Sequence, residues 1–153
     1  CEKMIQEYKS SDLILTVEKD ANIENLISIY EPFMNAIFDE KYYFLKEAGI
    51  LILRYLLNDK YEKVDDLAKI NFAKNVALQD KYGSEVNFTN SLQLNGKKSC
   101  SVDLATGTGK SYLIYAIAQI ALHSGLVDQV LVLCPSNTIE DGLNERIIEY
   151  RHI

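Results

Sequence analysis

The first 95 residues carry apolar side chains mainly at the spacing of an α-helix. From Ile23 to Tyr30 they recur every three or four positions, and Asn22, directly before them, is a residue type that caps helices. The spacing continues beyond Pro32, where a proline would interrupt a helix interior, so the pattern predicts a new helix rather than a continuation. Residues 42–57 are apolar on most sides, which predicts a central, buried helix.

A last helix of this region is predicted over about 64–82, with Gly83 at its end. Its candidate inward side chains are Leu67, Phe72, Val76 and Tyr82. The apolar segment 13–17 predicts a short strand. Residues 1–95 are therefore expected to form a mainly helical N-terminal region.

Residues 96–153 have a different organisation, in which short apolar runs alternate with glycine-containing turns. Segments 99–104 and 130–133 are predicted strands, and 110–123 is a predicted helix between them. A further helix is expected to start near Thr138. Strand, helix, strand and helix in this order predict an α/β fold with a parallel sheet and crossover helices.

The composition changes this picture little. In 153 residues, 48% hydrophobic and 25% charged side chains are ordinary for a globular protein and exclude a collagen-like or disordered chain. The net charge of -6 argues against a small basic nucleic-acid-binding module. However, 16 acidic and 11 basic side chains lie in residues 1–95, whereas residues 96–153, with 6 acidic and 5 basic side chains, are close to neutral.

The cysteines indicate neither a zinc site nor a disulfide framework, because Cys1, Cys100 and Cys134 are odd in number and widely spaced. Reduced thiols are typical of a cytoplasmic protein. The most apolar stretch is too short and too charged to span a bilayer, so no membrane partner is expected. Because the sequence starts at Cys1 and ends within a predicted helix, we expect it to be a piece of a longer protein.

The segment with the clearest chemistry joins the strand predicted over 99–104 to the helix that follows it. It reads Ala105-Thr106-Gly107-Thr108-Gly109-Lys110-Ser111, the composition of a phosphate-binding loop. The glycines allow backbone conformations in which successive N–H groups form a nest for phosphate oxygens. The helix N-terminus adds positive potential, Lys110 brings a full charge to the β- and γ-phosphates, and the Ser111 hydroxyl is placed to ligate Mg²⁺.

Residues Thr106 to Ser111 are therefore the candidate ATP-binding residues, with Lys110 as the candidate catalytic residue and Ser111 as the candidate metal ligand. The alternative is a glycine-rich strand-to-helix turn without a ligand. The adjacent Lys-Ser pair and the apolar pattern of the following helix favour nucleotide binding. One departure is Leu104, which stands where the general pattern has its first glycine.

With Leu104, the loop resembles motif I of superfamily 2 helicases and translocases, most closely the restriction (Res) subunits of type III restriction enzymes and their type I relatives. The segment 130–137 is similar to motif Ia of those enzymes, in which an apolar strand ends in a loop that touches the nucleic-acid backbone. The resemblance implies phosphate contacts from Ser136, Asn137 and Thr138. The alternative is a plain strand-to-helix loop with a serine or asparagine cap.

A weaker similarity concerns Tyr42-Tyr43-Phe44-Leu45-Lys46-Glu47-Ala48. Superfamily 2 enzymes often have an aromatic-Gln-x-Glu-Ala segment here, in which the aromatic ring stacks near adenine. The alignment puts Phe44 at the aromatic position and Leu45 at the glutamine position, and leucine cannot hydrogen-bond to the base. Alternatively, these aromatic side chains belong to the core at the start of a helix.

The resemblance implies that residues 96–153 are the N-terminal portion of a RecA-like P-loop domain that uses ATP and Mg²⁺. It also implies double-stranded DNA as the substrate of the full-length motor, a modification (methyltransferase) subunit as a partner, and a nuclease, where one exists, far downstream. The acidic Asp-Glu motif of the family does not follow the loop in this sequence. We therefore expect the chain alone to hydrolyse ATP negligibly, since phosphoryl transfer needs that motif.

Two other functions stay open on the residues alone. The chain could belong to another P-loop NTPase, such as a small kinase or a non-helicase ATPase. It could also be non-catalytic, with the acidic helical region 1–95 as an interaction or regulatory module.

Overall fold

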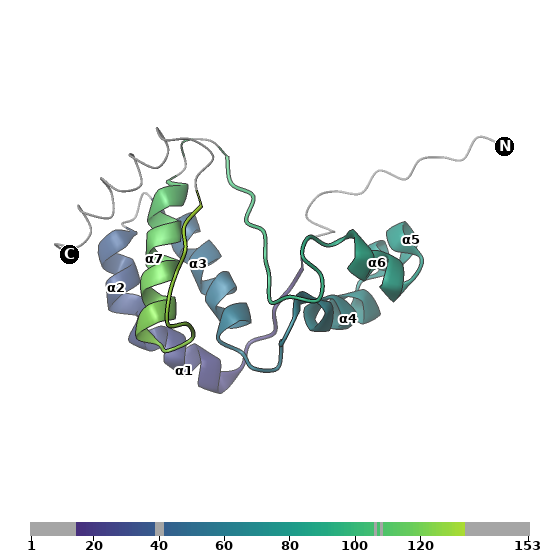
Figure 1. Cartoon of the computed structure of the whole chain (residues 1–153), viewed down its shortest axis with the longest axis horizontal. Coiled ribbons are helices and arrows are strands. Elements are labelled where there is room, and N and C mark those ends of the chain that lie inside the picture. The colour runs from purple at the N-terminus through teal and green to yellow at the C-terminus, as the bar shows by residue number, and fades with distance from the viewer. Residues whose placement is uncertain (1–14, 39–41, 106, 108, 134–153) are drawn as a thin grey trace. The chain divides into compact units, whose positions relative to one another are not determined.

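All of the regular structure that can be described in this chain is helical. The computed structural model describes residues 15–38, 42–105, 107 and 109–133, and in these ranges it contains seven α-helices and no β-strand. The helices divide between two compact units (Figure 1). One unit comprises Cys1–Glu18 and Asp59–Ser101, and the other comprises Lys19–Asn58 and Val102–Ile153. Each unit is therefore built from two separated stretches of sequence.

The unit that contains the glycine-rich loop has four of the described helices. They are α1 (Ala21–Ile29), α2 (Glu31–Ile37), α3 (Tyr43–Leu56) and α7 (Lys110–His123). The new helix predicted near Pro32 is confirmed as α2. Pro32 lies in the first turn of this helix, where a proline is tolerated because its missing N–H would have no acceptor within the helix. Helix α1 starts earlier than predicted, because Asp20 and not Asn22 is its cap. The Asp20 carboxylate accepts hydrogen bonds from the N–H groups of Asn22 and Ile23.

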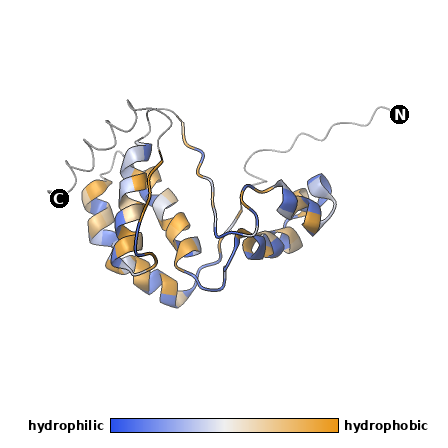
Figure 2. Ribbon diagram, in the orientation of Figure 1, coloured by the Kyte–Doolittle hydropathy of each residue, from blue (hydrophilic) through white to orange (hydrophobic). Residues whose placement is uncertain are grey.

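Helices α3 and α7 confirm the helices predicted over 42–57 and 110–123, and both contribute to the core of this unit. Leu45 and Leu53 of α3, Ile120 of α7 and Met34 of α2 are almost fully buried. Figure 2 shows apolar residues along most of α3 and α7. Burying each large aliphatic side chain contributes about 1.5–3 kcal/mol, so apolar burial is the main force that joins these helices.

An ion pair joins α1 to α3 beside this core. The Arg54 guanidinium donates to both carboxylate oxygens of Glu24, with Nη2 at 3.1 Å from Oε2. These hydrogen bonds hold the pKa of Glu24 below its usual value. A carboxylate with a lowered pKa in the folded state stabilises the fold above its unfolded-state pKa, and the contribution is lost as pH falls through the folded-state value.

The other unit has three short helices, α4 (Val64–Lys74), α5 (Val76–Tyr82) and α6 (Glu85–Ser91). The single helix predicted over about 64–82 is therefore broken in two. The break is at Asn75, whose extended backbone ends α4 and whose side chain accepts a hydrogen bond from the Leu78 N–H at the start of α5. Gly83, with φ of +75°, ends α5 as predicted. Helix α6 has no counterpart among the predicted elements.

The core of this second unit gathers side chains from all three helices. Leu67, Ala68, Leu78 and Phe88 are buried, and the ring of Phe88 lies 6.2 Å from that of Phe72 and 5.1 Å from that of Tyr82. Of the four predicted inward residues, Phe72 and Tyr82 pack against this core and Leu67 is buried. The prediction for Val76 is wrong, because its side chain is 66% exposed.

Asn71 connects the N-terminal segment of this unit to α4. Its amide nitrogen donates to the carbonyl oxygens of Thr16 (3.0 Å) and Leu67 (2.9 Å). Its amide oxygen accepts from the Thr16 N–H (2.8 Å) and the Thr16 hydroxyl (3.1 Å). The side chain is 4% exposed, and a buried amide is tolerated because its donors and acceptor are used. Thr16, which lies 55 positions before Asn71 in the sequence, is thereby held against α4.

The predicted parallel sheet is absent from the residues that the structure describes, and the α/β prediction, with its RecA-like sheet, is wrong for them. Segments 99–104 and 130–133 have irregular backbone, as do residues 15–17 of the predicted N-terminal strand. A strand needs a neighbouring strand to satisfy its N–H and C=O groups, and no strand is present in the described ranges. The apolar run lies outside the core, with Leu131 81% and Leu133 83% exposed.

Other expectations about the chain are not tested by these ranges. The helix expected near Thr138 lies outside the described residues, and the division into regions 1–95 and 96–153 stays a prediction. None of the described helices has both the length and the apolar character needed to cross a membrane.

Replacing Asn71 by alanine should lower the free energy of unfolding by about 1–3 kcal/mol, because the hydrogen bonds of its buried amide to Thr16 and to the Leu67 carbonyl are lost. Chemical denaturation followed by circular dichroism measures the change. Asn90→Ala, at an exposed asparagine in α6, is the matched control and should change stability by less than about 0.5 kcal/mol. Equal effects of the two substitutions would contradict the role assigned to Asn71.

Candidate phosphate-binding site

Two glycines set the backbone of the loop that precedes α7. Gly109 is the N-cap of α7 and has left-handed backbone angles, φ +92° and ψ +34°. Gly107 has φ of +78°, and a Cβ added there would meet no described residue within 4 Å other than its own chain neighbours. Residues with a side chain rarely adopt such angles, so both positions require glycine for conformational reasons. Thr106 and Thr108, the predicted binding residues on either side of Gly107, lie outside the described residues.

Lys110 and Ser111 are the first two residues of α7. Lys110 is exposed and Ser111 is half-buried. No side chain of the described ranges caps this helix N-terminus through a hydrogen bond, and its first turn contains no acidic residue. The N–H groups of a first turn have no acceptor within the helix, and they carry the positive end of the helix dipole. This arrangement suits an anion such as a phosphate group.

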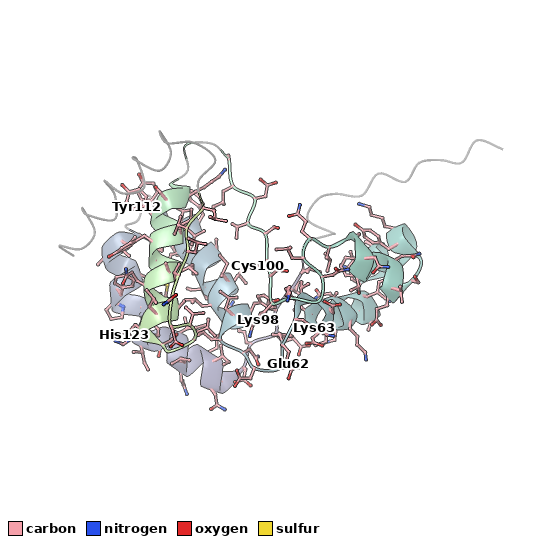
Figure 3. All side chains as sticks on the ribbon, in the orientation of Figure 1. Glu62, Lys63, Lys98, Cys100, Tyr112 and His123 are labelled. Carbon is pink, nitrogen blue, oxygen red and sulfur yellow. The ribbon has the colours of Figure 1, made fainter. Side chains whose placement is uncertain are left out.

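The start of α3 supports Gly109 from the side. A Cβ added at Gly109 would lie 3.1 Å from Leu45 Cδ1, 3.2 Å from Tyr112 Cδ2 and 3.6 Å from Tyr42 Cε1. Tyr42 is the N-cap of α3, and its ring stacks on that of Tyr112 with centroids 5.5 Å apart. Tyr112 lies at the N-terminal end of α7, and His123 at the opposite end (Figure 3). The loop is thus packed closely at Gly109 and open at Gly107.

The same two helices meet a second time one turn further on. A Cβ added at Gly49 of α3 would lie 3.3 Å from Leu113 Cδ1 of α7. Since Leu45 adjoins Gly109 and Gly49 adjoins Leu113, the helices run side by side in the same direction. Their N-termini therefore lie together, and among the described residues α3, like α7, has neither a side-chain cap nor an acidic residue in its first turn. The loop consequently lies near two positive helix ends.

The structure does not place the other predicted site residues, Phe44 and Ser136 to Thr138, at the glycine-rich loop. Phe44, the predicted adenine neighbour, is in the first turn of α3 and is 46% exposed. Its neighbours Tyr42 and Leu45 are the residues that adjoin the loop. Ser136, Asn137 and Thr138, the predicted nucleic-acid contacts, lie outside the described residues.

Sequence reasoning missed the role of Tyr42 and Tyr112. Their contact joins residues 70 positions apart, and helical periodicity contains no information on such pairing. The aromatic residues around 42–44 were the available signal, but the alignment favoured Phe44 over Tyr42.

The described residues contain no group of three or more His, Cys, Asp or Glu side chains that could hold a metal ion. The Mg²⁺ that the family resemblance implies is a cation that is bound by few protein groups together with substrate phosphates.

Comparison with known proteins identifies the family. The family model described as type III restriction enzyme, res subunit, matches residues 62–152, more than half of the chain, and the chain belongs to this family. Neither a curated protein nor a solved structure matches the chain. The matched range includes the whole glycine-rich loop and helix α7.

The family relates this chain to helicases and translocases. It suggests nucleotide binding and DNA as a partner, in agreement with the resemblance noted in motif I. The family does not by itself assign a specific activity to this chain.

Gly109→Ala should destabilise the chain more than Gly125→Ala does. Both glycines have positive φ, so each substitution introduces backbone strain of about 1–2 kcal/mol. Only at Gly109 would the new methyl group also crowd Leu45 and Tyr112, which adds about 1–3 kcal/mol of overpacking. Thermal and chemical unfolding of both variants compares them. An equal loss of stability would show that the close contact at Gly109 is unimportant.

Proposed function

We propose that this chain is the ATP-binding part of an ATP-dependent DNA helicase or translocase, the restriction subunit of a type III restriction–modification enzyme. The observation that carries the proposal is the family match, which spans the loop at residues 105–111. The uncapped N-terminus of α7, which directly follows the left-handed Gly109, supports it because that geometry suits a phosphate group.

Each described residue of the loop has a chemical role in this proposal. The first-turn N–H groups of α7 bind phosphate oxygens, and Lys110 neutralises charge on the β- and γ-phosphates. The Ser111 hydroxyl would hold Mg²⁺, which would supply positive charge to stabilise the phosphates. Among the described residues, none beyond the chain neighbours of Gly107 lies within 4 Å of the position of a Cβ there, which is consistent with room for the phosphates.

The proposal extends to DNA and to a partner subunit through the family. Ser136, Asn137 and Thr138 would contact the sugar–phosphate backbone without reading bases. In the full-length protein, ATP hydrolysis would drive movement on double-stranded DNA, in partnership with a modification subunit. The 153 residues alone are expected to hydrolyse ATP negligibly, because no Asp-Glu motif follows the loop within them.

Titration of the purified chain with fluorescently labelled ATP and Mg²⁺ tests nucleotide binding. Lys110→Ala should weaken binding roughly ten- to a hundredfold, because a charge-assisted contact to phosphate is lost. Lys69→Ala, at an exposed lysine of α4, is the matched control and should leave the affinity unchanged. The proposal fails if the wild-type chain does not bind at millimolar nucleotide, or if both variants bind as the wild type does.

A further inference from the structure

We propose that the stacked pair Tyr42–Tyr112 is a positioning element for the phosphate-binding loop. It holds Gly109 in its left-handed conformation and thereby fixes the direction of the first-turn N–H groups of α7. Its effect on nucleotide affinity rests on the proposed function, whereas its effect on the loop does not. Neither tyrosine belongs to the residues predicted to touch the nucleotide.

The contacts lie on one side of Gly109. The two rings are nearly parallel, with an interplanar angle of 26° and centroids 5.5 Å apart. Tyr112 also donates its backbone N–H to the Gly109 carbonyl oxygen at 3.0 Å, so the same residue meets the glycine through both backbone and ring. Tyr42 belongs to the N-terminus of α3 and not to the loop. The stack therefore joins the first turn of α7, which directly follows the loop, to a separate helix.

Leu45 completes the support, and it belongs to the core. Its side chain is 0% exposed, and its Cδ1 lies 3.1 Å from the position that a Cβ of Gly109 would take. Gly109 therefore packs against a fully buried residue of α3. Gly107, by contrast, has no such neighbour within 4 Å in the part of the chain that the structure describes. The two glycines thus differ in role, since Gly109 is the supported position and Gly107 the open one.

Loss of the stack should loosen the loop without removing any predicted ligand contact. An aromatic pair contributes stabilisation beyond that expected from its buried area. This extra stabilisation changes an equilibrium constant by roughly two- to tenfold. A loop that spends less time in its binding conformation binds with an affinity reduced by the same factor. Tyr42→Ala should therefore speed amide exchange and weaken nucleotide binding, each by roughly two- to tenfold.

The experiment combines hydrogen exchange, measured by mass spectrometry over residues 107–113 of the free chain, with labelled-ATP titration. The variants are Tyr42→Ala, Tyr42→Phe, which keeps the ring, and Phe33→Ala. Phe33 of α2 lies 6.3 Å from the ring of Tyr115, so its loss removes an aromatic contact from α7 away from the loop. Phe33→Ala thus matches the loss of an aromatic contact while leaving the proposed support intact.

Faster exchange over 107–113 in Tyr42→Ala, with wild-type exchange in Tyr42→Phe and Phe33→Ala, is the expected result. Unchanged exchange in Tyr42→Ala, or equal acceleration in Phe33→Ala, would overturn the positioning role. If exchange behaves as expected but the wild type binds no nucleotide, the proposed function fails and the positioning of the loop stands. If Lys110→Ala weakens binding as expected while Tyr42→Ala both exchanges and binds as the wild type does, the proposed function stands and the positioning role fails.

Discussion

Helices α3 and α7 approach each other closely at two contacts, and in each contact a glycine from one helix or its N-cap faces a leucine of the other helix. Leu113 of α7 lies where a side chain at Gly49 would project, and Leu45 of α3 lies where a side chain at Gly109 would project. The two contacts are one helical turn apart and fix the relative register of the helices. Close packing of this kind tolerates little added volume, so register and loop geometry depend on the same glycines.

This register determines what surrounds the loop. It brings the N-termini of both helices together, and neither has an acidic residue in its first turn. It also sets Tyr42 against Tyr112, so that the backbone of Gly109 is supported by a helix from a distant part of the sequence. At the opposite end of α7, the Tyr30 hydroxyl lies 3.0 Å from His123 Nδ1. A phosphate-binding loop gains from such support, since preorganised donors bind without a further ordering cost.

The sequence predicted the helices better than the sheet, for a physical reason. Helical spacing depends on local contacts, so residues 42–57 and 110–123 were identified almost to their ends. The apolar run 130–133 indicates burial in a sheet, but a strand forms only against another strand, and none is present in the described residues. The break at Asn75 depends on a side-chain cap within a continuous apolar pattern. At the site, the glycines predicted backbone conformations that a side chain would obstruct, and Gly107 and Gly109 have positive φ. The contact between Tyr42 and Tyr112 is long-range, and helical periodicity carries no information on such pairing.

The central claim is that the N-terminus of α7, with its glycine loop, binds the phosphates of a nucleotide. Heteronuclear NMR of the labelled chain, titrated with ATP and Mg²⁺, tests it most directly because each backbone amide reports separately. The account predicts that the amides of Gly107, Gly109, Lys110 and Ser111 shift most and in a saturable way, while those of α5 and α6 stay unchanged. Shifts confined to α5 and α6, or no saturable shift at the loop at millimolar nucleotide, would contradict it.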